Sequence, residues 1–168
     1  FDERNLFLDI SQINENIHIS KSSTNEVNLI IFNSKSNDEY PKSIFLDLSN
    51  NSKLNVVHFN VSNNKSFLYF ETNLQDNSYL NFVSFQSDNI HTRNEFYASL
   101  NQDCNFDLYG LNINNYGVND NYSFIQHLKP SSSSREVFKS IVEKGAITNF
   151  QGKIYVDSIA QKTDGYQM

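Results

Sequence analysis

The amino-acid sequence predicts an all-β fold, a β-solenoid with two strands in each coil of about 26 residues. Two features of the composition indicate strands. The 14 Phe and 9 Tyr among 168 residues favour the extended backbone, and Asn and Ser gather in the turns between short apolar runs. The third observation is an internal repeat with a constant period, which a flat meander has no reason to keep.

The first 45 residues predict leading coils that are less regular than the rest. Strands are expected in "ENIHIS", in "NLIIFN" around Ile30 and in "SIFLDLSN" around Phe45. Residues 46–168 predict regular coils, so we interpret residues 1–168 as one domain, a fragment of a β-helix. No cap is evident around Met168, and we expect further coils or another domain of the full protein beyond it.

Three copies of one segment carry the repeat. "NSKLNVVHFN" begins at Asn51, "NSYLNFVSFQ" at Asn77 and "DCNFDLYGLN" at Asp103, a spacing of about 26 residues both times. Stacked coils place equivalent residues about 4.8 Å apart, which predicts continuous apolar columns. The predicted columns are Leu54–Leu80–Phe106, Val56–Phe82–Leu108, Val57–Val83–Tyr109 and Phe59–Phe85–Leu111, with Phe70–Phe96–Tyr122 in the second strand of each coil.

The parity of the apolar residues leaves one question open. Leu54 and Val56 keep the period of two that a half-buried strand requires, but Val57 and Phe59 are apolar on the other parity. Either a bulge or corner re-aims the strand near residue 56, or both of its faces are covered.

The segment after "SSSS" allows two interpretations. "REVFKSIVEKG" fits a short helix that ends at Gly145, and residues 136–144 fit a strand comparably well. We favour the strand because the segment lies between predicted strands. The β pattern then continues in "NFQGKIYV".

Charge and cysteine content exclude several function classes. The net charge of −6 and the pI near 5.1 give no general attraction to nucleic acid or to an anionic membrane surface. No apolar run approaches the roughly 20 residues that span a bilayer. Cys104 is the only cysteine, so this chain has no internal disulfide and no metal site built from its own cysteines. A reducing cytoplasm is the expected compartment.

Single residues offer candidate sites rather than a catalytic constellation. His127 has the chemistry of an iron ligand or proton shuttle, and of a hydrogen-bonded structural residue. Arg135, Lys162 and Asp164 are candidates for contacts with a partner subunit, while solvated turns explain them equally. Cys104 opens a repeat in which earlier copies carry Ser52 and Ser78, so we interpret it as a small turn residue. No paired carboxylates stack on one face, and we expect no enzyme.

The closing third resembles a known family. "HLKPSSSSREVFKSIVEKGAITNFQGKIYVDSIAQKTDGYQM" is similar to the SufB/SufD iron–sulfur cluster assembly scaffolds, and more to their SufD branch. The resemblance rests on His127 with Ser134-Arg135, on "FKSIV", on the strand from Phe150 to Val156, and on "AQKTDGYQ".

This resemblance implies a right-handed parallel β-helix that pairs with a SufB-like subunit and is driven by a SufC-like ATPase. It also implies a cluster that is assembled transiently in the full complex, with ligands outside this span, so that this fragment alone binds no cofactor or metal. A homodimer is possible, and in a eukaryote the compartment is a plastid-type organelle. The alternative is a surface or secreted β-solenoid that binds carbohydrate or acts as an adhesin, which an exposed aromatic row would favour.

Overall fold

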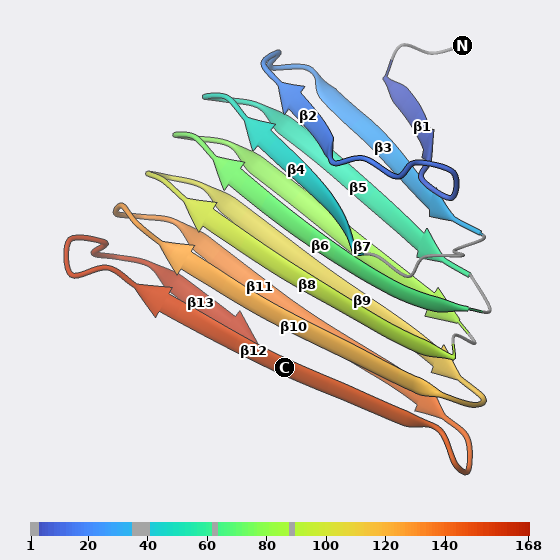
Figure 1. The fold of residues 1–168 in the computed structure, drawn as a ribbon. Coiled ribbons are helices and arrows are strands. Elements are labelled where there is room, and N and C mark those ends of the chain that lie inside the picture. The colour runs from blue at the N-terminus through green and yellow to red at the C-terminus, as the bar shows by residue number, and fades with distance from the viewer. Residues whose placement is uncertain (1–3, 35–40, 62–63, 88–89) are drawn as a thin grey trace.

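The structure, a computed structural model, describes residues 4–34, 41–61, 64–87 and 90–168. The regular secondary structure in these ranges consists of β-strands alone (Figure 1). No helix in the described residues is long and apolar enough to cross a membrane. The strands are β1 (Asn5–Asp9), β2 (Ile17–Lys21), β3 (Glu26–Asn33), β4 (Lys42–Leu48), β5 (Lys53–Asn60), β6 (Lys65–Leu74), β7 (Tyr79–Ser87), β8 (His91–Leu100), β9 (Asn105–Asn114), β10 (Val118–His127), β11 (Ser133–Val142), β12 (Ile147–Val156) and β13 (Asp164–Gln167).

The strands form two parallel sheets that share the chain alternately. Sheet A contains the odd-numbered strands in the order β1-β3-β5-β7-β9-β11-β13, and sheet B contains the even-numbered strands in the order β12-β10-β8-β6-β4-β2. Each coil therefore gives one strand to each sheet, and Figure 1 shows the coils stacked along one axis. The predicted β-solenoid is confirmed, and so is the strand interpretation of residues 136–142, which lie in β11.

The register confirms the four predicted columns of sheet A. Leu54 pairs with Leu80 and Leu80 with Phe106, and the other three columns pair in the same way through β5, β7 and β9. Asn51, Asn77 and Asp103, the first residues of the three copies, all have left-handed backbone, with φ of 61°, 59° and 55°. Asn and Asp tolerate this conformation better than other residues with a side chain.

The predicted column Phe70–Phe96–Tyr122 is wrong at its last member. Phe70 pairs with Phe96, but Phe96 pairs with Ser123. The cause is an insertion of one residue between the start of β9 and the start of β10, compared with the same stretch of the preceding coil. A constant period therefore misaligns everything after Gly117, which takes a φ of 78° in the corner between these strands.

Strict alternation settles the question of parity. Along β5 the inward residues are buried and the outward residues, including Val57 and Phe59, are partly exposed, with no bulge. Inside the solenoid the ring of Phe82 lies 5.0 Å from that of Phe70 and 5.4 Å from that of Phe96. Outside, the ring of Phe59 contacts the equivalent rings of the coils before and after it, so both faces carry apolar side chains.

Candidate functional site

The sequence candidates lie in the C-terminal coils, where β10 to β13 place them on both sides of sheet A. Arg135 and Asp164 line a groove of about 420 Å³ on the outer face of sheet A. His127 is fully buried at the end of β10 and lies behind the groove. Lys162 is not among the groove residues and occupies the turn before β13, where its φ is 58°. The groove is lined by Tyr79, Asn105, Asp107, Tyr109, Ser133, Ser134, Arg135, Asp164 and Tyr166.

His127 is held by two serine hydroxyls. Its Nδ1 lies 2.6 Å from Ser132 Oγ and its Nε2 lies 2.9 Å from Ser134 Oγ. Burial lowers the pKa of His127, and the charge of Asp164 opposes this by raising it. Both ring nitrogens are thus engaged, and a metal could bind only by displacing a serine. Ser134 is buried and faces the interior, so the imidazole is enclosed beneath the strand whose outer face carries Arg135.

The groove is lined by polar side chains and by charged side chains of both signs. The Arg135 guanidinium lies 5.3 Å from the ring centroid of Tyr166, a cation–π contact that fixes its position. The hydroxyl of Tyr79 donates to Asp107 Oδ2 at 3.3 Å, and burial followed by the charge of Asp107 raises the pKa of Tyr79. A fixed guanidinium beside carboxylates suits the side chains of another protein better than a free metal ion.

Glu136 is the buried acid that sequence reasoning missed. Its side chain is fully buried in the column Leu29–Val56–Phe82–Leu108, next to the hydroxyl of Ser123, which donates to Oε2. Its other oxygen, Oε1, has no hydrogen-bond partner among the described residues. Burial raises the pKa of Glu136 to about 7, and the bond from Ser123 opposes this shift. The signal in the sequence would have been an acidic residue that aligns with an apolar column. It was hidden because the later coils are longer, so a constant period does not align Glu136 with that column.

The interior stays polar in the coil beyond Glu136. A Cβ added at Gly152 would lie 1.8 Å from Gln167 Nε2 and 2.9 Å from Ser123 Oγ. A side chain at position 152 would have to displace the end of the Gln167 side chain, which fills the space next to Ser123. The C-terminal coils thus replace the Phe and Leu of the central coils with Ser, Glu and Gln.

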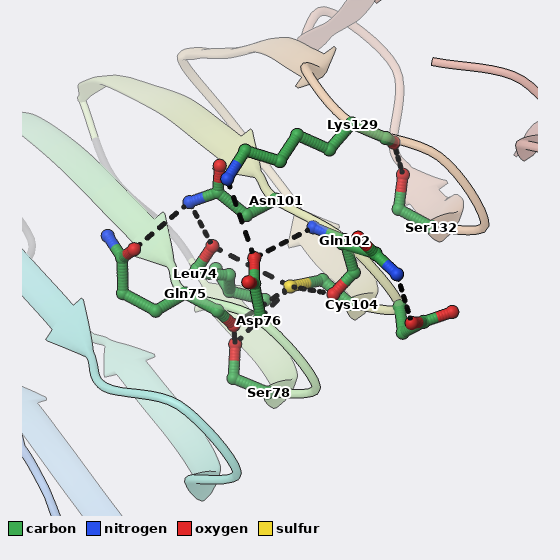
Figure 2. Close-up of polar contacts among 10 residues, drawn as sticks. Leu74, Gln75, Asp76, Ser78, Asn101, Gln102, Cys104, Lys129 and Ser132 are labelled. Carbon is green, nitrogen blue, oxygen red and sulfur yellow. Dashed lines mark hydrogen bonds and ion pairs between the residues drawn. The ribbon is translucent and has the colours of Figure 1, made fainter. Parts of the chain in front are cut away.

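Cys104 lies in a different place, at the corner between β8 and β9 (Figure 2). It is fully buried, and its Sγ lies 3.0 Å from the carbonyl oxygen of Gln75. Ser78 of the preceding coil donates to the same carbonyl at 2.5 Å, so the thiol occupies a corner position that serine occupies elsewhere. Within residues 4–34, 41–61, 64–87 and 90–168, no group of three or more His, Cys, Asp and Glu side chains could hold a metal ion.

Comparison with known proteins identifies one family. A family model described as "SUF system FeS cluster assembly, SufBD core domain" matches residues 9–168, which is nearly the whole chain. No curated protein and no solved structure matches the chain.

Proposed function

The chain belongs to the SufBD core family of the SUF system for iron–sulfur cluster assembly, and we propose that it acts there as a SufD-like, non-enzymatic scaffold subunit. The observation that carries this proposal is the family match, which includes the candidate site and the segment from His127 to Gln167. In this role the cluster is cargo, and the chain contributes shape and contact surface rather than a catalytic step.

The proposed partners are a SufB-like subunit and a SufC-like ATPase. The groove supports a protein partner, because Arg135 is held over Tyr166 beside Asp164. In this position its guanidinium can donate two hydrogen bonds to a carboxylate of the partner. Exposed apolar side chains in the same coils, among them Ile147 and Tyr155, add a surface that excludes water. We place the complex in a reducing compartment, the cytoplasm or, in a eukaryote, a plastid-type organelle.

Co-purification of the tagged full-length protein tests this role. We expect a SufB-like chain and a SufC-like ATPase to elute with the wild type, and Arg135→Glu to weaken recovery of the SufB-like chain. Lys144→Glu, the same charge change at an exposed corner, is the matched control and should leave recovery unchanged. Elution of the protein alone would contradict the proposal, and equal effects of both variants would remove the groove from it.

We also propose that this span binds no stable cluster by itself. The thiol of Cys104 is buried and bonded to carbonyl oxygens, and both nitrogens of His127 are bonded to serines. Anaerobic reconstitution followed by iron and sulfide analysis should therefore give no more bound iron than a Cys104→Ser variant. A stoichiometric cluster that disappears in that variant would contradict this expectation.

One observation favours the second candidate function, carbohydrate binding. Phe32, Phe59 and Phe85 form a row of rings on the outer face of sheet A, with ring centroids 5.4 and 6.0 Å apart. Exposed aromatic rows of this kind can stack on sugars. Glycan-array binding that is lost in Phe59→Ala, by a protein that recovers no SUF partner, would reverse the ranking.

A further inference from the structure

The outer face of sheet B carries a row of rings that crosses the strands from β2 to β10. Neighbouring rings lie between 4.5 Å and 6.3 Å apart, measured between their centroids. All of them occupy outward, exposed or partly exposed positions. We call this row the outer aromatic ladder: His18, Phe45, Tyr69, Tyr97, Tyr122 and Phe124. The faces of such rings attract cations.

Glu71 lies inside this ladder. Its partners in the neighbouring strands are Phe45 in β4 and Tyr97 in β8, so an aromatic residue flanks the acid on each side. The hydroxyl of Tyr69 donates to Glu71 Oε2 at 2.9 Å. Burial, and next the hydrogen bond to Glu71, raises the pKa of Tyr69 to about 12, so the hydroxyl keeps its proton at neutral pH. Glu71 is therefore a partly exposed carboxylate whose position is fixed among rings.

Cations of the chain itself serve other positions of this face. Arg93 Nε lies 2.6 Å from Glu95 Oε1, and Lys153 Nζ lies 5.0 Å from the ring centroid of Phe124. Among the described residues, no Lys, Arg or His forms an ion pair with Glu71. A carboxylate beside ring faces attracts a cation both by its charge and through the rings. Glu71 therefore offers a binding position for a cation from outside these residues.

A groove of about 370 Å³ adjoins Glu71 on the same face. Tyr69 connects the two, since it lines the groove and its hydroxyl holds Glu71. Side chains on one face of an extended segment are about 6.7 Å apart, which is also the spacing of Tyr69 and Glu71 along β6. A segment with an apolar side chain in the groove can thus bring a second side chain, two residues on, to Glu71. The groove is lined by Pro41, Ser43, Phe67, Leu68, Tyr69, Arg93 and Glu95.

We propose that Glu71, flanked by Phe45 and Tyr97, binds an arginine side chain of a partner protein, and that a neighbouring apolar side chain of the same segment occupies the groove. A planar guanidinium can lie on a ring while it donates two hydrogen bonds to a carboxylate, whereas the ammonium of lysine acts as a point charge. The chain already makes a contact of the first kind on sheet A, where Arg135 lies over Tyr166.

Charge and shape favour a basic segment of a protein over other ligands. The net charge of −6 attracts a basic partner in general. Sites for small molecules enclose most of the ligand, whereas Glu71 stands on the outer face of a sheet. This face belongs to sheet B, and the groove of Arg135 belongs to sheet A. The contact therefore adds a second surface to the proposed scaffold role and does not depend on it.

NMR titration of the purified protein with the peptide acetyl-Leu-Ser-Arg-Ser-amide tests the site. We expect saturable shifts of the Phe45, Tyr69 and Tyr97 ring signals, with a dissociation constant of about 1 mM. The same peptide with citrulline in place of arginine keeps the shape without the charge and should bind roughly tenfold more weakly. No saturable shift at about 10 mM peptide, or equal binding of the two peptides, overturns the proposal.

Two variants locate the arginine on the protein. Glu71→Gln keeps the shape of the acid and should raise the dissociation constant at least about threefold. Glu143→Gln removes the same charge from an exposed corner and is the matched control, with an expected change of less than about twofold. Tyr97→Leu keeps the carboxylate but removes a ring, and should weaken binding roughly threefold. Circular dichroism verifies that all three variants fold. Equal effects of Glu71→Gln and Glu143→Gln, or unchanged binding in Tyr97→Leu, overturn the assignment.

Discussion

Replacing the buried acid Glu136 with glutamine should stabilise the protein at pH 8 and leave its stability nearly unchanged at pH 4. The carboxyl group is fully buried, and burial raises its pKa from 4.5 to about 7. Between these two values the folded state holds a proton that the unfolded state releases, so the free energy of unfolding falls as the pH rises through this window.

The magnitude follows from the size of the shift. A difference of about 2.5 pH units corresponds to about 3 kcal/mol, because each unit is worth about 1.4 kcal/mol. Glutamine keeps the shape of the acid and the acceptor for the Ser123 hydroxyl but cannot ionise. We therefore expect Glu136→Gln to add up to about 3 kcal/mol at pH 8, where the wild type must ionise a buried group.

Urea unfolding at several pH values between 4 and 8 provides the assay. The quantity to compare is the difference in unfolding free energy between variant and wild type at each pH, which cancels the contribution of every other titrating group. Glu143→Gln removes a carboxylate from an exposed corner and is the matched control, with an expected difference of about 0.5 kcal/mol or less at all pH values. A Glu136→Gln difference that is the same at pH 4 and pH 8 would refute the reasoning.

Three further predictions concern the centre of the solenoid. Phe82→Ala should lower the free energy of unfolding in urea by about 3–5 kcal/mol, because Phe82 contacts Phe70 and Phe96. Val83→Ala, on the outward face, should lower it by less than about 1.5 kcal/mol. A small change in Phe82→Ala would show that the column is not core. Asn77→Ala should lower stability by about 1 kcal/mol and Asn77→Gly should not, because the φ of 59° penalises alanine; equal thermal midpoints would contradict this. His58 is fully buried and its pKa is lowered to about 3, so stability should be lost as the pH falls from 6.5 towards 3, and His58→Gln should reduce that loss in acid titrations followed by circular dichroism.

The repeat allowed the β-solenoid and its stacked columns to be predicted from the sequence, but only where the period stays constant. Columns that join β5, β7 and β9 follow directly from the constant spacing of the three copies, and Leu54, Leu80 and Phe106 stack as expected. Later coils are longer, since more of the chain separates Phe106 from its partner Ser134, and more again separates Ser134 from its partner Gly165. Periodicity gives no warning of such insertions, because an extra corner residue changes the register without changing the alternation within the next strand.

The candidate site was predictable only in part for the same reason. Arg135 and Asp164 were singled out as separate residues, and the structure places both on one groove. Their neighbours Tyr79 and Asp107 come from earlier coils of the chain. This grouping depends on the register between coils, and the constant period of the repeat does not predict that register beyond Asn114. Glu136 was missed because the constant period places Ser134, and not the acid, opposite Leu108.

The position of the unfavourable residues supports a functional role for the C-terminal coils. A solenoid gains its stability from each coil stacking on the next, so apolar interiors of the kind formed by Phe70, Phe82 and Phe96 are the stable choice. The last coils depart from that choice at Glu136 in β11, the only buried carboxylic acid among the described residues, whereas a buried histidine occurs both here, as His127 in β10, and in the central coils, as His58 in β5. Each substitution costs stability, and proteins keep such costs mainly where function requires the residue. The central coils, whose interior carries Phe70, Phe82 and Phe96, then hold the coil that carries Glu136 in register.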